Sequence, residues 1–252
     1  MTRRLARDET ARVTTVFLHA HPDDEAIFTG GTIARLVEHR ERVVVVFATD
    51  GALGGDARVR ATEIEAAALA LGVDEVVQLD YPDSGLSTID PRSFAAAAIN
   101  EVADHLVTIL DDEDATTLVT YDEFGIYGHP DHVHVHRVGR AVLARRACAL
   151  YEATVDHEYL HFVETHLVSE ARAAAAQTLG HIGATVGLPS VLIDTTVDVR
   201  DAIEVKRAAM AAHASQIPPT ASAMRLSGAD FAAVYGHEWY LRHGPRGSIE
   251  SL

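Results

Sequence analysis

Residues 13–25 read Val-Thr-Thr-Val-Phe-Leu-His-Ala-His-Pro-Asp-Asp-Glu, an apolar run followed at once by imidazole and carboxylate side chains. The apolar part, residues 13–20, predicts a buried β-strand. His21 is then the first residue beyond the carboxyl end of that strand. Because open α/β folds bind their ligands at this edge of the sheet, the stretch predicts both a first strand and a functional site.

Strand and helix signals alternate through the first 160 residues or so. Their order predicts an α/β fold, Rossmann-like and doubly wound, with a mostly parallel sheet flanked by helices. The further strands are expected at 42–49, 76–79 and 116–121, and the helices at 25–39, 58–71, 93–110 and 130–146.

The second half of the chain is less regular. It predicts strands near 158–163 and 190–197, and helices at 169–179 and 201–214. Neither a linker nor an internal repeat separates the halves. We therefore expect one domain over residues 1–252, with a core of about 13–160 and a small C-terminal lobe of about 161–252.

The composition limits the partners. A net charge of −16 argues against binding to nucleic acid or to an anionic membrane. No apolar run approaches the roughly 18 residues of a membrane span, and residues 1–12 lack the apolar segment of a signal peptide. A single cysteine, Cys148, fits a reducing compartment. These features predict a cytoplasmic protein; they leave a homo-oligomer open.

A second polar cluster, Tyr-Gly-His-Pro-Asp-His at 127–132, follows the predicted strand at 116–121. His21 and Asp24 are three residues apart on a turn that enters a helix, so both can face one point. With His132 they form a set of two imidazoles and one carboxylate. This set suits Zn²⁺ or another divalent transition ion and leaves a coordination position for water.

The two clusters, residues 20–25 and 127–132, together resemble the LmbE/PIG-L-type zinc deacetylases. These enzymes remove acetyl groups from N-acetylglucosamine conjugates and include a mycothiol-pathway deacetylase and amidase. Three shorter stretches extend the resemblance: Arg60–Glu63, Asp83–Gly85, and Lys206 with His213–Gln216.

The resemblance implies a Rossmann-like hydrolase with one Zn²⁺ per chain, or Fe²⁺ in its place, bound by His21, Asp24 and His132. It implies that Asp23 is the general base that takes a proton from the attacking water. The substrate would be a small N-acetylated molecule, most plausibly a sugar conjugate.

The second cluster supplies further implied roles. His129 would stabilise the oxyanion or protonate the leaving amine, and Asp131 would help to keep its imidazole charged. The hydroxyl of Tyr127 would donate to the developing oxyanion.

Arg60 and Asp83 match positions that hold sugar hydroxyls in the family. His213 is either a helix-surface residue or a contact at the rim of the site. Two residues depart from the family pattern: Ala52 stands where Glu is usual, and Leu86 where Met is usual. The missing carboxylate leaves the chemistry intact but leaves the identity of the sugar open.

Several alternatives remain. Within the same reaction class, the chain could be a thiol-conjugate amidase or a tailoring deacetylase for a secondary metabolite. Two histidines and a carboxylate also describe the iron facial triad, although such sites usually lie in antiparallel barrels. A non-catalytic sugar-binding module is expected to have lost Asp23 or His129, and this chain keeps both.

Three other features have simpler interpretations. We expect His19 to be a core histidine or a neighbour of the metal ligands, and His134 to lie on a helix surface. The segment 235–240, which contains the only tryptophan, is either an aromatic patch in the C-terminal lobe or part of a substrate mouth.

Overall fold

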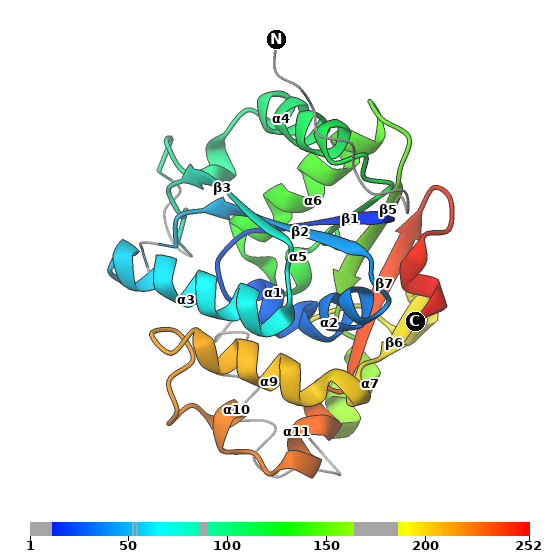
Figure 1. The fold of residues 1–252 in the computed structure, drawn as a ribbon. Helices are drawn as coiled ribbons and strands as arrows, with labels where there is room; N and C mark the ends of the chain where they lie inside the picture. The colour runs from blue at the N-terminus through cyan, green and yellow to red at the C-terminus, as the bar shows by residue number, and fades with distance from the viewer. Residues whose placement is uncertain (1–11, 52, 54, 86–89, 164–185) are drawn as a thin grey trace.

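The computed structural model describes residues 12–51, 53, 55–85, 90–163 and 186–252. Its described strands form one sheet in the order β3-β2-β1-β4-β5-β7-β6 (Figure 1). Strands β1 to β5 pair in parallel, and β7 runs antiparallel to both β5 and β6. The strands are β1 (Thr14–His19), β2 (Arg42–Thr49), β3 (Glu75–Tyr81), β4 (Thr117–Tyr121), β5 (Ala149–Thr154), β6 (Thr195–Asp198) and β7 (His237–His243). The predicted mostly parallel α/β sheet is confirmed.

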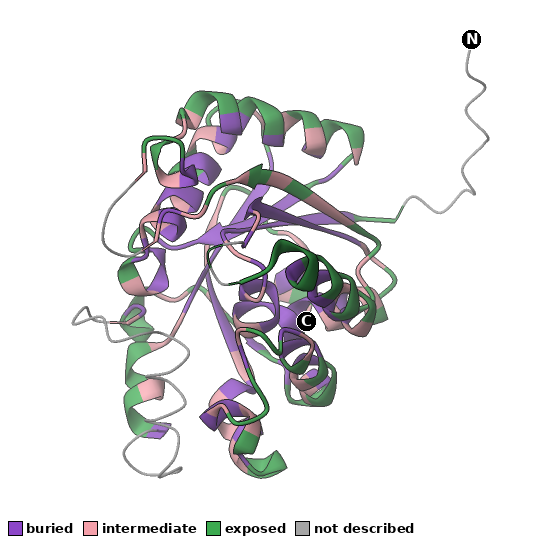
Figure 2. Ribbon diagram, turned by 90° about the vertical axis from the view of Figure 1, so that its left-hand side faces the viewer, coloured by how far each residue is buried: buried purple, intermediate pink, exposed green. Residues whose placement is uncertain are grey.

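Helices cover both faces of the sheet. The helices α2 (Gly30–Glu38), α3 (Ala57–Leu71) and α9 (Ile203–Ala212) lie on one face, and α4 (Ile99–Asp112) and α6 (Pro130–Leu143) on the other (Figure 1). The central strands are consequently buried on both sides, as their colour in Figure 2 shows. This two-sided burial explains the nearly unbroken valine run of β2.

Helix α3 shows how the sequence directs polar side chains inward. The Asp56 carboxylate caps its first turn by accepting from the Arg58 N–H at 2.8 Å, and Gly72 ends it in the left-handed conformation. One face of the helix is buried at the spacing of helical turns. That face consists of Arg60, Glu63, Ile64, Ala67 and Leu71.

The helix predicted at 25–39 is in fact two helices, α1 (Asp24–Phe28) and α2. The break falls at Thr29, which lies outside the helical region with φ −136°. Gly31 permits a close approach just after the break, because a Cβ there would lie 2.3 Å from Val199. The chain therefore bends where one continuous helix was predicted. This bend places α2 against the C-terminal part of the chain.

The strand predicted near 158–163 is wrong, since residues His157–Phe162 form helix α7. The Asp156 carboxylate caps that helix by accepting from the Tyr159 N–H at 2.9 Å. The strand of this region, β5, lies earlier, at 149–154. The helix predicted at 169–179 lies outside the described residues.

The strand expected near 190–197 is shorter in the structure and is β6; it follows a 3₁₀ turn at 190–192. Helix α9 confirms the one expected at 201–214. Strand β7 was not predicted, because its buried Glu238 interrupts the apolar pattern. Among the described residues, the remaining short α-helices are α5 (Gly125–Gly128), α10 (Ser222–Arg225) and α11 (Gly228–Tyr235).

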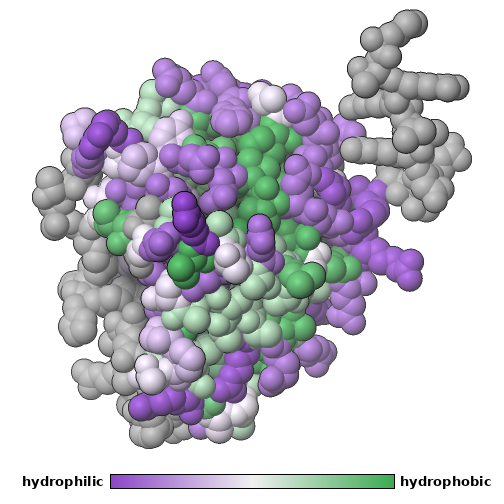
Figure 3. Space-filling model, turned by 60° about the vertical axis from the view of Figure 1, so that its left-hand side comes forward, coloured by the Kyte–Doolittle hydropathy of each residue, from purple (hydrophilic) through white to green (hydrophobic). Residues whose placement is uncertain are grey.

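The described helices include none with both the length and the apolarity to cross a bilayer. On the face that Figure 3 presents, hydrophilic side chains surround a band of hydrophobic ones. Such a mixture is ordinary for a folded domain, because polar side chains are too few to cover the whole surface.

A buried ion pair joins the C-terminal part of the chain to α2. Lys206, the only lysine in the sequence, lies 2.7 Å from Glu238 through its Nζ. The Glu238 carboxylate also accepts from the backbone N–H groups of Gly31 and Thr32, each at 2.8 Å. Glu238 therefore neutralises the lysine and caps the start of α2 at once.

We predict that Lys206→Met lowers the free energy of unfolding by about 3–5 kcal/mol, because it leaves the Glu238 charge buried without its cationic partner. Chemical denaturation measures this loss. The matched control is Arg145→Met, which removes the surface pair with Asp104 at 3.0 Å and is expected to cost at most about 1 kcal/mol. Equal losses in the two variants would contradict the assignment of a structural role to the buried pair.

Candidate metal centre and active site

The site lies where the order of the strands reverses. Strand β1 has β2 on one side and β4 on the other, so the connections leaving β1 and β4 diverge at their carboxyl ends. Such a switch point leaves a crevice in an open α/β sheet. His21 follows β1, and His132 lies in the first turn of α6, after β4. The fold thus brings together two clusters that are more than 100 residues apart in the sequence.

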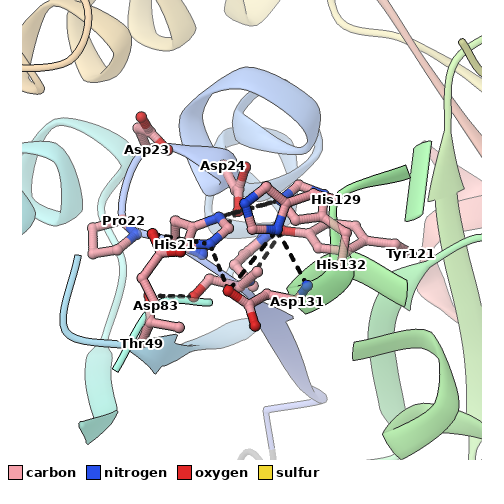
Figure 4. Close-up of polar contacts among 12 residues, drawn as sticks. His21, Pro22, Asp23, Asp24, Thr49, Asp83, Tyr121, His129, Asp131 and His132 are labelled. Carbon is pink, nitrogen blue, oxygen red and sulfur yellow. Dashed lines mark hydrogen bonds and ion pairs between the residues drawn. The ribbon is translucent and has the colours of Figure 1, made fainter. Parts of the chain in front are cut away.

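Three side chains converge on one point, as Figure 4 shows. The Asp24 Oδ2 atom lies 3.4 Å from His21 Nδ1 and 3.2 Å from His132 Nε2. The two imidazole nitrogens are 3.3 Å apart. Asp24 and His132 are buried, and His21 is partly exposed to the cleft.

This triangle has the size that a tetrahedral metal ion requires. Ligands at about 2.0–2.2 Å from a tetrahedral ion stand about 3.4 Å from one another. The donor set, two imidazole nitrogens and one carboxylate oxygen, also matches the ligands that zinc prefers. The residues present therefore fit a divalent ion with an open fourth position.

The Asp131 carboxylate orients His21. Its Oδ2 lies 3.2 Å from His21 Nε2 and also accepts from the backbone N–H of Ser84 at 2.9 Å. A carboxylate on Nε2 holds the proton there and leaves Nδ1 free to bind a metal. Asp83 lies 3.4 Å from the same nitrogen. Burial alone would lower the pKa of His21, but the carboxylates of Asp131, Asp24 and Asp83 raise it well above its usual value.

Aromatic packing fixes the other imidazole. The ring of Tyr121 stacks on His132 with centroids 4.4 Å apart. The Tyr121 hydroxyl lies 2.8 Å from His19 Nδ1, and His19 Nε2 lies 3.0 Å from the Thr29 hydroxyl. Burial lowers the pKa of His19 to about 4. His19 is therefore a neutral core histidine behind the site, as the sequence predicted.

Asp23 stands beside the triangle without belonging to it (Figure 4). Its φ of 124° is rare for a residue with a side chain, so its backbone is strained. The Glu25 carboxylate holds this conformation: Oε2 accepts from the Asp23 N–H at 2.9 Å, and Oε1 lies 2.6 Å from His213 Nε2. Burial and then the Asp24 charge raise the pKa of Asp23 to about 7.

His129 and Tyr127 face the same site. The hydroxyl of Tyr127 lies 3.3 Å from His132 Nε2, and burial followed by the Asp24 charge raises the pKa of Tyr127 well above its usual value. His129 Nδ1 accepts from the backbone N–H of Asp131 at 3.1 Å. The proton of a neutral His129 must therefore sit on Nε2.

The expected charged state of His129 does not agree with this geometry. The Asp131 carboxylate lies 3.9 Å from His129 Nδ1 and closer, at 3.2 Å, to His21 Nε2. Burial, and then the neighbouring His21 and His132, lower the pKa of His129 to about 4. His129 is therefore a neutral donor through Nε2, and Asp131 is placed to orient His21.

These side chains open into a cleft that is partly open to solvent. Arg60 and Asp83 line it, and their contacts with sugar hydroxyls stay a prediction. The Arg60 guanidinium also donates to the Pro22 carbonyl and lies 3.2 Å from Glu63, so it holds the turn that carries Asp23. Burial opposes ionisation of Asp83, but His21 and the Gly85 N–H keep its pKa below its usual range.

The structure places His213 away from the lining of the cleft. It is fully buried and pairs with Glu25, so it can act on the site only through Glu25 and Asp23. The prediction for His134 is wrong, because its ring is buried and packs edge-on against Phe94. Ala52 and Leu86, the two departures from the family pattern, lie outside the described residues.

Glu25 and Glu63 lie in the motifs at residues 20–25 and 60–63, but the sequence indicates no role for either. Glu63 accepts from the Ser215 N–H at 2.6 Å and from its hydroxyl at 2.7 Å. The late motif is thus explained by its partners: Lys206 pairs with Glu238, His213 with Glu25, and Ser215 with Glu63. Each of these three residues pairs with a buried glutamate from a distant part of the chain. The spacing of residues in the sequence does not reveal such pairs.

Comparison with known proteins identifies the family of the chain. The family model described as PIG-L, GlcNAc-PI de-N-acetylase, matches residues 16–143. The chain belongs to the PIG-L family. A relative from Actinosynnema mirum, 1D-myo-inositol 2-acetamido-2-deoxy-alpha-D-glucopyranoside deacetylase, is 33% identical over 239 residues, which cover 82% of each chain. The resemblance drawn from the sequence motifs is confirmed.

Solved structures share the fold of this PIG-L family member. The N,N'-diacetylchitobiose deacetylase from Pyrococcus horikoshii has a TM-score of 0.56 at 23% identity, and 91% of this chain covers 83% of that one. The zinc-inhibited form of teicoplanin deacetylase Orf2 has a TM-score of 0.60 at 16% identity, with 92% and 99% covered. At such identities the likeness supports the α/β architecture.

A glycine allows α5 to pack on the metal site. Gly125 has φ +61°, and a Cβ there would lie 2.6 Å from His132 Cβ and 2.7 Å from the Val133 nitrogen. Gly128, in the same short helix, has φ +90°, but a Cβ there would meet nothing within 4 Å among the described atoms. The two positions share backbone strain and differ in space.

We predict that Gly128→Ala costs about 1–2 kcal/mol of stability from backbone strain alone. Gly125→Ala should cost a further 1–3 kcal/mol or so, because the new methyl group overpacks against His132. Denaturant unfolding of both variants measures the difference. Similar losses would show that α5 does not need this close approach.

Proposed function

We propose that this chain is a zinc-dependent N-deacetylase that hydrolyses N-acetylglucosamine conjugates. The observation that carries the proposal is the triangle of His21, Asp24 and His132, whose size and donor set suit a tetrahedral zinc ion with an open position. Membership of the PIG-L family favours amide hydrolysis over oxygen chemistry. The name of the Actinosynnema relative suggests an N-acetylglucosaminyl inositol as the first substrate to test.

A divalent ion bound at this site would polarise the amide carbonyl and lower the pKa of a water molecule. Asp23 lines the cleft and is not needed as a ligand, so its carboxylate is free to take the proton of the attacking water. A pKa near neutrality suits this exchange, because the same group can then return the proton to the amine as the C–N bond breaks.

Two neutral donors stabilise the charge that develops on the carbonyl oxygen. The Tyr127 hydroxyl keeps its proton because its pKa is raised, and His129 presents Nε2–H because its Nδ1 is an acceptor. Fixed donors of this kind commonly supply a large part of a rate enhancement. The products are acetate and the free amine, which balance the water and amide consumed.

Arg60 and Asp83 are the proposed contacts for sugar hydroxyls. Both line the cleft, and they offer a donor and an acceptor of opposite charge. His213 is proposed as a positioning residue, because it acts on Asp23 through Glu25.

We predict that Asp23→Asn keeps its zinc but loses roughly 10²- to 10⁴-fold in kcat, as expected for a missing general base. The adjacent change Asp24→Asn serves as the comparison, since it removes a proposed ligand and should lose the zinc itself. Metal analysis and amine release measure the two properties separately. Near-normal turnover in Asp23→Asn would remove Asp23 from the role of base.

We also predict that His132→Ala abolishes stoichiometric zinc binding. His134→Ala is the matched control, because His134 lies on the same helix, is buried and faces Phe94 instead. Equilibrium dialysis followed by elemental analysis gives the occupancy of each variant. Full occupancy in His132→Ala would place the third ligand elsewhere.

A further inference from the structure

A second cavity lies next to the catalytic cleft. It is partly open to solvent, and its described walls come from α1, β5, α7, α9, α11 and β7. The helices α7, α9 and α11 gather at the same end of β7 in Figure 1. Most of the walls are apolar or aromatic; they include Ile27, Phe28, Tyr159, Leu160, Val234 and Trp239.

The two cavities share a wall. Ile27 and Phe28 line both of them. The ring of Phe28 lies 6.2 Å from the His132 ring and 6.4 Å from the Tyr127 ring, measured between centroids. Phe28 is therefore the wall between the second cavity and the side chains of His132 and Tyr127.

The charged groups in the walls are already satisfied. Lys206 and Glu238 neutralise each other, and Glu238 also accepts from two backbone N–H groups of α2. The Tyr159 hydroxyl donates to the Ala233 carbonyl at 2.8 Å. What the cavity presents to a ligand is mainly hydrocarbon and aromatic surface.

The orientation of a bound substrate follows from the groups that lie at the two ring nitrogens of His21. Asp83, a proposed sugar contact, lies on the Nε2 side of that ring, and Phe28 lies against His132 on the Nδ1 side. An amide whose carbonyl is held at the metal, with its sugar toward Asp83, therefore points its acyl group toward Ile27 and Phe28. This step rests on the proposed function.

We propose that the second cavity is an acyl pocket, which binds the hydrocarbon chain of N-acyl amino sugars with acyl groups longer than acetyl. The reaction is the same hydrolysis, with the corresponding longer carboxylic acid released in place of acetate. Burying each additional methylene is worth about a fourfold gain in kcat/KM while the chain stays within the pocket.

The only tryptophan of the chain, Trp239, lines this pocket, so intrinsic fluorescence reports on it directly. Zinc-loaded Asp23→Asn protein is titrated with N-hexanoylglucosamine and, separately, with N-acetylglucosamine. We expect a saturable change in emission with the hexanoyl compound and a much smaller one with the acetyl compound. Unchanged emission over a hexanoyl titration that saturates the site in a competition assay would overturn the proposal.

Kinetics test the pocket independently. Val234→Phe and Leu160→Phe fill it from α11 and α7, two different walls. Each should lower the ratio of hexanoyl to acetyl kcat/KM by tenfold or more, in proteins whose thermal unfolding remains cooperative. The control Val191→Phe makes the same change at a surface position that is 88% exposed, and should leave the ratio unchanged.

The outcomes separate the two proposals. If the wild-type protein hydrolyses neither acetyl nor hexanoyl amides, the proposed function fails. If it hydrolyses the acetyl amide but shows no gain with longer chains, or if both filling variants keep the wild-type ratio, only the acyl pocket is overturned.

Discussion

Four carboxylates converge on the ends of β1 and β4, and this concentration of negative charge is the constraint that organises the site. Asp24, Asp83 and Asp131 all lie within 3.4 Å of a nitrogen of His21, and the partly buried Asp23 lines the same cleft. So many acidic groups in a half-buried crevice repel one another unless positive charge is bound among them. A divalent cation bound among them would relieve this repulsion. The pKa of Asp23 has a different main cause, because burial raises it most and the Asp24 charge comes second.

Three buried glutamates connect the C-terminal part of the chain to the elements around this crevice. Glu238 joins Lys206 to the start of α2, Glu63 joins Ser215 to Arg60, and Glu25 joins His213 to the Asp23 backbone. Each glutamate is nearly inaccessible to solvent, so each needs its partner to stay ionised without a large penalty. The strained φ of Asp23 persists because Glu25 and Arg60 hold the turn on both sides. The C-terminal part of the chain, residues 186–252, therefore helps to hold the turn that carries Asp23.

The sequence predicts those features that depend on local pattern. The strands β1, β2 and β4 are marked by apolar runs, and the ligands are marked by their place just beyond two of those runs. Long-range partners are a different matter, since nothing in the spacing of Glu25 and His213 reveals that they meet. The same limit explains the errors: His134 is buried because Phe94 packs on it, and β7 escapes notice because Glu238 finds its partner on α9. The sequence pairs Asp131 with His129, its neighbour in the motif. In the structure its carboxylate lies closer to His21.

The antiparallel strand β7 has a consequence for specificity. By pairing with β5 it extends the sheet past the metal site and carries Trp239 to the wall beside Phe28. A sheet that ended at β5 would lack this wall. In the proposed mechanism the catalytic residues follow β1 and β4, whereas the proposed acyl pocket is formed largely by β7 and the helices α7 and α11 packed around it. Because few residues belong to both sets, the acyl pocket can change in size while the metal triangle stays fixed, so one catalytic core can serve substrates with different acyl groups.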